Sequence, residues 1–140
     1  MSGRYFLDTN IFVYSFDASS PAKRERALGL IREAVAMGAG VISYQVVQEF
    51  FNVALRRFAR PMSPEEAQQY LITVLRPLVA VESSLNLLQH GLYIRSRFNL
   101  SWFDSLIVAA AIEARCEALY TEDLQDGLEI EGLRIENPFL

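Results

Sequence analysis

The sequence predicts an α/β protein, a three-layer α/β/α sandwich with a mainly parallel central sheet. Short apolar segments alternate with longer segments in which apolar residues recur at helical spacing, as is typical of parallel sheets covered by helices. The chain has 140 residues, 51% of them hydrophobic, so one domain over residues 1–140 is expected. The first strand, at residues 5–7, runs directly into the polar residues Asp8, Thr9 and Asn10. In an open α/β sheet such a turn lies at the carboxyl edge, where ligands bind.

Two long helices are expected on either side of the second strand. Pro21 opens the first, which ends at Gly38 or Gly40, because proline is favoured in the first turn and glycine beyond the last. Residues 41–42 form the strand, and residues 43–57 form the next helix. The expected inward faces of the two helices comprise Ala27, Leu28, Leu30, Ile31, Ala34 and Val35, and then Val46, Val47, Phe50, Phe51, Ala54 and Leu55.

The second half of the chain continues the alternation. The expected elements are a helix at 63–77, a strand at 78–81, helices from 83 or 84 to about 97 and at 102–115, a strand at 118–120 and an edge strand at 133–136. Residues 78–81 are uniformly apolar, as in a strand covered on both faces. Residues 106–112 are apolar nearly all round, which places their helix centrally.

Four acids are expected to meet at the carboxyl edge of the sheet. Asp8 and Asp123 follow strands, and Glu49 lies about two turns into a helix that leaves the same edge, roughly 9 Å from it. The helix of Asp104 leads into the strand at 118–120, so it runs antiparallel to that strand and begins at the carboxyl edge. The four carboxylates would therefore share one crevice.

Such a crevice indicates a divalent cation, because crowded carboxylates repel one another unless a positive charge compensates them. Ligands that are all oxygen favour Mg²⁺ or Mn²⁺ over zinc. Cys116 is the only cysteine and is expected to be a small buried residue, and the only histidine, His90, is expected at the surface. Paired cations of this kind activate water and stabilise the leaving oxygen in phosphodiester cleavage.

The polar residues after the first strand and at the start of the helix at 102–115 also have structural interpretations. Asn10 or Thr9 could cap a helix while Asp8 supports the turn. Asp104 could complete a capping box with Ser101.

The remaining acids leave alternatives open as well. Glu49 could be one more solvated helix charge. Asp123 could cap a short turn, with Glu122 or Asp126 as the ligand in its place.

Four stretches of the sequence resemble the acidic motifs of one known family. They are DTN at residues 8–10, QVVQEF at 45–50, SWFDSLIVAAA at 101–111 and LYTEDL at 119–124. Together, in this order and spacing, they are similar to the motifs of PIN-domain ribonucleases, and most similar to those of VapC-type toxins of bacterial toxin–antitoxin pairs. The resemblance covers nearly the whole chain.

The resemblance implies a PIN-like nuclease domain that cleaves RNA with Mg²⁺ or Mn²⁺ by means of metal-activated water. It also implies a homodimer, held inactive by a cognate antitoxin whose C-terminal segment wraps the toxin and obstructs the site. By the same resemblance, the catalytic metal ligands would be Asp8, Glu49, Asp104 and Asp123, with Thr121 supporting the site through its hydroxyl and Asn10 orienting Asp8 or a water.

Two other functions compete with a nuclease. A catalytically silent PIN-fold binding module would most simply have lost one of the acids, and all four remain. An aspartyl phosphoacceptor domain, a receiver or a dehalogenase-like phosphatase, is disfavoured, because the phosphatases carry an acid where this chain has Asn10 and receivers need a late lysine, whereas Lys23 is the only lysine.

The charge is compatible with an RNA partner in spite of its negative sign. The formal net charge is −4, but setting aside the four acids leaves 13 acids against 13 cations, and 12 of these cations are arginines. Arginine suits bidentate phosphate contacts. The arginines expected to contact RNA phosphates cluster near helix ends with Phe58 and Phe98 between them; they are Arg56, Arg57, Arg60, Arg95 and Arg97.

The helices between residues 64 and 97 carry more large apolar residues than one face of a small domain buries. An interface with a second copy or with an antitoxin is therefore expected there. The residues concerned are Tyr70, Leu71, Val74, Leu75, Leu87, Leu88, Leu92 and Tyr93. No apolar run approaches the roughly 20 residues of a membrane span and no secretory signal is apparent, so a cytoplasmic protein is expected.

Overall fold

The computed structural model describes residues 3–140 and contains a six-stranded sheet with the strand order β3-β2-β1-β4-β6-β5. The strands are β1 (Arg4–Leu7), β2 (Gly40–Ser43), β3 (Val79–Val81), β4 (Cys116–Tyr120), β5 (Glu129–Ile130) and β6 (Leu133–Glu136). All neighbouring pairs are parallel except β5 and β6, which are antiparallel. The predicted α/β class with a mainly parallel sheet is confirmed.

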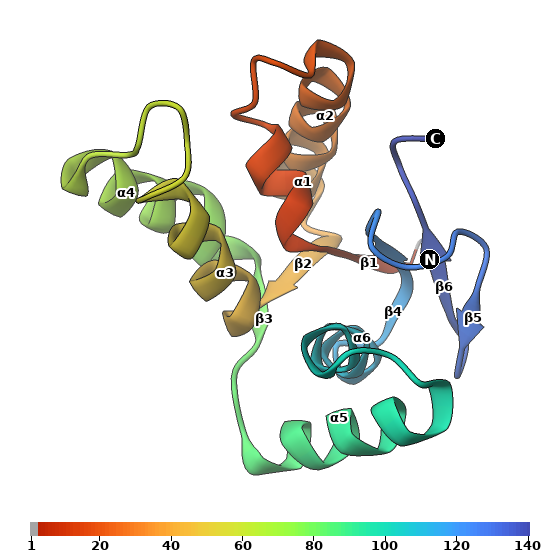
Figure 1. Cartoon of the computed structure of the whole chain (residues 1–140). Coiled ribbons are helices and arrows are strands. Elements are labelled where there is room, and N and C mark those ends of the chain that lie inside the picture. Colours follow the sequence, from red (N-terminus) through yellow and green to blue (C-terminus); the bar gives the residue numbers. More distant parts are fainter. Residues whose placement is uncertain (1–2) are drawn as a thin grey trace.

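Helices cover both faces of the sheet (Figure 1). They are α1 (Thr9–Tyr14), α2 (Pro21–Met37), α3 (Tyr44–Ala54), α4 (Pro64–Tyr70), α5 (Leu85–Phe98) and α6 (Trp102–Glu113). Figure 1 shows α5 and α6 on one side of the sheet and α1 and α2 on the other. After α4, a π-helical turn (Leu71–Leu75) and a 3-10 turn (Arg76–Leu78) lead to β3.

The core lies along the central strands and α6. The side chains of Phe6, Leu7, Ile42 and Leu119 are fully buried, and residues 105–111 of α6 are buried as well. This helix is therefore central, as its nearly continuous apolar sequence predicts. Its burial fixes the position of its first turn, which carries Asp104.

The inward faces of two helices are narrower than predicted. The buried residues of α2 follow a strict helical stripe (Ala27, Leu30, Ile31 and Ala34), and Val35, one position off that stripe, is 46% exposed. The helix predicted for residues 43–57 ends at Ala54, so Leu55 leaves the face and is also 46% exposed. The predictions for Val35 and Leu55 are wrong.

Two sheet edges also differ from the prediction. β3 is an edge strand in which Ala80 is exposed, so it is not covered on both faces. β6 is not an edge strand, because β5 pairs with its outer side. The hairpin turn between β5 and β6 has positive φ at Glu131 (50°) and Gly132 (86°), the pattern of a type I′ turn. Asn or Asp usually precedes the glycine in such a turn. Because Glu131 stands there instead, the sequence pattern does not predict the hairpin.

Candidate active site

Asp8 lies at the carboxyl end of β1, and both of its carboxylate oxygens are held. Thr9 N donates to Oδ1 at 2.7 Å, and Thr121 Oγ1 donates to Oδ2 at 2.7 Å. The Asp8 amide donates to Tyr120 O at 3.1 Å, which joins the end of β1 to the end of β4. Asp8 itself is the N-cap of α1, so the interpretation of Asn10 or Thr9 as the cap is wrong.

Glu49 faces the start of α1 from the neighbouring helix α3. Thr9 Oγ1 donates to Glu49 Oε1 at 2.7 Å, and Gln45 Nε2 donates to Oε2 at 3.1 Å. Gln45 Nε2 also lies 3.2 Å from Phe103 O, in the first turn of α6. The carboxylate of Glu49 is therefore oriented by two neighbours and is not a freely solvated helix charge.

Asp104 lies in the first turn of α6 and Asp123 in the turn after β4; together with Asp8 and Glu49 they make up the group of four acids that we call the crevice. The buried hydroxyl of Thr121 accepts from Asp123 N at 3.1 Å while it donates to Asp8, so it links the two acids. Ser101 Oγ accepts from Asp104 N at 3.2 Å and caps α6. A capping box also requires a bond from the Ser101 amide to the Asp104 carboxylate, and the structure does not contain this bond. The Asp104 carboxylate is therefore not engaged in capping α6.

Burial and, to a smaller extent, the charges of neighbouring acids raise the pKa values of Asp8 and Asp123. Burial raises the pKa of Asp8 to about 7, the hydrogen bonds from Thr121 and Thr9 oppose this rise, and the charges of Asp123 and Glu49 add to it. Burial also raises the pKa of Asp123, with further contributions from the charges of Asp104, Glu122 and Glu49. The four predicted acids therefore act on one another across a shared space.

Glu122 and Asp126, the alternatives to Asp123, have other partners. Tyr14 Oη donates to Glu122 Oε2, and Lys23 Nζ forms an ion pair with Glu122 Oε1 at 3.1 Å. Asp126 Oδ1 accepts from Asn137 N at 2.8 Å. These contacts, from residues far away in the sequence, hold both side chains and leave Asp123 as the acid of this turn with the fewest other partners.

The donor set fits a divalent cation in type and charge. It consists of oxygens alone, and the amide of Asn10 is buried beside Asp123, whose pKa it helps to hold down. Within residues 3–140, however, no three His, Cys, Asp or Glu side chains stand close enough together to form a ready-made metal site.

The five arginines predicted to bind RNA do not form one cluster. Arg56, Arg57 and Arg60 lie in the connection between α3 and α4, whereas Arg95 and Arg97 lie in the last turn of α5. Figure 1 shows these two segments on opposite sides of α6. His90, on α5, lies 3.9 Å from Glu131 and is not part of the crevice.

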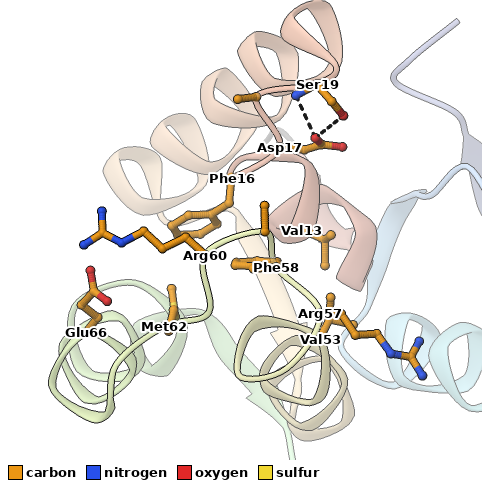
Figure 2. A pocket seen from close by; sticks show the side chains of 12 residues that line it. Val13, Phe16, Asp17, Ser19, Val53, Arg57, Phe58, Arg60, Met62 and Glu66 are labelled. Atoms are coloured by element: carbon orange, nitrogen blue, oxygen red, sulfur yellow. Dashed lines mark hydrogen bonds between the residues drawn. The ribbon is translucent and has the colours of Figure 1, made fainter.

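A cavity of about 620 Å³ that the sequence did not reveal lies between α1, α3 and the start of α4 (Figure 2). Val13 and Val53 line it, and each lies one helical turn beyond a crevice residue, Thr9 on α1 and Glu49 on α3. The rings of Phe16 and Phe58 form part of its wall, with their centroids 5.3 Å apart. Its polar lining comprises Asp17, Ser19, Arg57, Arg60 and Glu66.

A mainly parallel α/β sandwich with acids gathered at the carboxyl edge defines the class of this protein as a PIN fold. Residues 5–125 match the PIN domain family, so the chain belongs to that family. Membership indicates a nuclease.

Three solved structures share this fold over nearly their whole length. The first is a toxin–antitoxin complex from Klebsiella pneumoniae, with 22% sequence identity and a TM-score of 0.68; the match covers 96% of this chain and 97% of that one. The second is a DNA-bound VapBC from Salmonella typhimurium, with 20% identity and a TM-score of 0.65, covering 98% of this chain and 99% of that one. The third is VapBC2 from Rickettsia felis bound to a promoter DNA fragment, with 20% identity and a TM-score of 0.59, covering 95% of this chain and 97% of that one. No curated protein matches the chain. Between residues 3 and 140 no helix is long and apolar enough to cross a membrane.

Proposed function

We propose that this protein is a Mg²⁺- or Mn²⁺-dependent endoribonuclease and the toxin of a type II toxin–antitoxin pair. The observation that supports the proposal is the electrostatic coupling of the predicted acids: burial, with the charges of Asp123 and Glu49, raises the pKa of Asp8 to about 7, and burial, with the charges of Asp104 and Glu49 among others, raises the pKa of Asp123. The likeness to solved toxin–antitoxin complexes supports the biological setting.

The residues of the crevice divide the work of binding and orientation. When bound, a divalent cation would activate water and neutralise charge on the scissile phosphate. Asp8 would be the best-oriented ligand of that cation, because Thr9 and Thr121 hold its two oxygens. Glu49 is oriented by Thr9 and Gln45, and the buried amide of Asn10, beside Asp123, would orient that ligand or a water.

The nucleophile is expected to be water and not the 2′-hydroxyl of the ribose. Activation of that hydroxyl usually needs a general base in the site, and the single histidine, His90, lies on α5 outside the crevice. Attack by water in line with the leaving 3′ oxygen leaves a 5′-phosphate and a 3′-hydroxyl.

The purified protein is therefore expected to cut single-stranded RNA with Mg²⁺ or Mn²⁺ and to stop cutting in EDTA. Mapping the ends of the products should give 5′-phosphates and 3′-hydroxyls. Chelator-resistant cutting or cyclic-phosphate ends would contradict the proposed mechanism. Absence of cutting under all these conditions, with RNA binding intact, would instead favour a silent binding module.

Two groups of arginines are proposed to contact RNA phosphates. All five are exposed, but their separation means that one short RNA segment contacts one group at a time: Arg56, Arg57 and Arg60 on one side, or Arg95 and Arg97 on the other. Arg57 and Arg60 also line the cavity of Figure 2, so an occupant of that cavity would compete with RNA for them.

An apolar segment of the antitoxin is the proposed occupant of that cavity. The cavity is largely apolar, and it begins one helical turn from Thr9 and Glu49, so a segment lying in it would continue into the crevice and block it. The lining carries both charges, Arg57 and Arg60 against Asp17 and Glu66, so the apolar contacts determine the proposed fit.

Val53→Asp is expected to weaken binding of the antitoxin about thirtyfold, because a charge would be buried against an apolar segment. RNA cleavage in the absence of antitoxin should persist. Val35→Asp, at an exposed position on α2 outside the cavity, is the matched control. Titration calorimetry with the cognate antitoxin measures both; equal effects of the two variants would contradict this assignment.

The proposed surface for a homodimer is the outer face of α5. Leu85 and Leu92 share one helix face and are 80% and 58% exposed, with Tyr93 beside them at 49%. Leu88, 38% exposed, faces a separate small hollow. Of the other residues in the predicted set, Leu75 and Leu87 are buried in the core, and Tyr70, Leu71 and Val74 are half-buried against it, so they are not available to an interface to the same degree.

A further inference from the structure

A small hollow of about 100 Å³ lies beside the acidic crevice. The elements around it are the end of β2, the start of α3, the segment after β3, and α5 and α6. Two aromatic side chains among its lining residues are unusually open to solvent: Phe103 is 61% exposed and Tyr44 is 47% exposed. Large exposed rings on an otherwise well-packed surface are typical of binding sites.

Ser43 supplies a second and independent sign of a ligand. It lines the hollow, its side chain is 2% exposed, and its hydroxyl has no hydrogen-bond partner. Ser43 is the N-cap of α3, where a serine hydroxyl ordinarily accepts from a backbone amide, yet it makes no such bond. A buried hydroxyl without a partner costs free energy, and a ligand that hydrogen-bonds to it would recover that cost.

The hollow is joined to the acidic crevice through Gln45 and Phe103. Gln45 lines the hollow, and its amide donates to Glu49 and lies against Phe103 O. Phe103 directly precedes Asp104 in the first turn of α6. A strand of nucleic acid with one phosphate among the acids would therefore bring a neighbouring nucleotide to the hollow.

We propose that this hollow binds one unpaired base of the RNA substrate, with the base stacked on Phe103 or Tyr44 and hydrogen-bonded to Ser43. The proposal rests on the proposed function. Base stacking on exposed aromatic rings is the common way in which proteins hold single-stranded RNA, whereas paired bases present no free face. The site thus selects single-stranded segments and positions the phosphate next to the bound base for cleavage.

The charges around the hollow favour a base over a phosphate. Glu82 lines it and would repel a phosphate, but its carboxylate can accept a hydrogen bond from an amino group of a base. No Lys or Arg is among the residues that line the hollow in the described part of the chain. The occupant is therefore the uncharged part of the nucleotide.

The test measures how binding depends on each base of a single-stranded RNA. Labelled RNAs carry one abasic site at each position in turn, and fluorescence anisotropy measures their affinity for the protein. Ca²⁺ replaces Mg²⁺ to prevent cleavage, and gels verify that the RNA stays intact. The wild-type protein is expected to lose about tenfold in affinity at one position. Phe103→Ala should weaken binding of the intact RNA by a similar factor and should no longer respond to the abasic site.

Two further variants sharpen the test. Ser43→Ala fills the same space without the hydroxyl, and it should reduce the preference among bases at that position while keeping stacking. Met37→Ala, which removes a 74% exposed apolar side chain at the far end of α2, should change nothing.

Three results would overturn the proposal. If the protein binds RNA but Phe103→Ala changes the effect of an abasic site at no position, the base-binding hollow is rejected while the proposed function stands. Dissociation of a dimer by Phe103→Ala in sedimentation, with the abasic profile unchanged, would assign the hollow to contact between two copies. Failure of the wild-type protein to bind any single-stranded RNA would reject the proposed function together with the site.

Discussion

Asp104→Asn is expected to lower RNA cleavage by at least about a hundredfold, because it removes one ligand charge from the crevice. The fold should survive, since the Asp104 side chain makes no capping bond with Ser101 and its backbone amide keeps the cap. Asp8→Asn should have an effect of the same size. The measurement is single-turnover cleavage of a single-stranded RNA in Mg²⁺, with unfolding curves recorded for each variant.

Ser101→Ala is the matched control for Asp104→Asn. It removes the cap itself and should cost about 1 kcal/mol of stability, but it should leave cleavage nearly normal because the carboxylate remains. If Asp104 served only to begin the helix, the pattern would be reversed. Near-normal cleavage by Asp104→Asn would therefore remove this residue from the proposed site.

Asp8→Asn is expected to stabilise the metal-free protein at pH 8. The pKa of Asp8 is raised from 3.8 to about 7 in the folded protein, so the folded state holds a proton that the unfolded state has lost between these two values. The free energy of unfolding must then fall as the pH rises from about 4 to about 7. At 1.36 kcal/mol per pKa unit, the loss at pH 8 is at most about 4 kcal/mol.

Removal of the ionisable group should flatten this dependence. Asn keeps the shape and the capping ability of Asp, so in EDTA the variant should be about 1 to 4 kcal/mol more stable than the wild type at pH 8 and similar to it at pH 4. Mg²⁺ should stabilise the wild type and not the variant. Asp126→Asn, which changes an acid outside the crevice, controls for general charge effects.

Thermal or urea unfolding at pH 4, 6 and 8, with EDTA and with Mg²⁺, measures these differences. A wild-type protein whose metal-free stability is constant or rises over this range would contradict the raised pKa of Asp8.

The sequence alone was sufficient to predict the α/β class, because it rests on local patterns and on general rules of chain connection. Bulky residues before Asp8 and an apolar segment in α6 with hardly a polar face identify a strand and a central helix whatever their neighbours. The direction of a helix between parallel strands is also fixed, which is why the start of α6 could be placed at the carboxyl edge.

The sequence was less reliable wherever a feature depends on what lies next to it. The helical pattern predicted that Val35 and Leu55 are buried. Val35 is exposed because the sheet covers only a narrow stripe of α2, and Leu55 is exposed because α3 ends before it. β6 was predicted to be an edge strand because β5 was not predicted. With only two residues, β5 is too short to show an alternating pattern, and the turn that follows it contains an atypical residue, Glu131.

Within the site, only the tertiary structure decided which acid of the turn after β4 is left for the crevice. Glu122 and Asp123 are adjacent acids that local sequence cannot rank. They differ because Tyr14 and Lys23, about a hundred residues away in the chain, bind Glu122, while Thr121 orients the backbone of Asp123. In the same way, the unpaired hydroxyl of Ser43 exists only because the folded chain buries it without a partner. Sequence patterns fix the hydrophobic periodicity of each element, but hydrogen bonds and charge pairs between distant residues form only once the elements have packed.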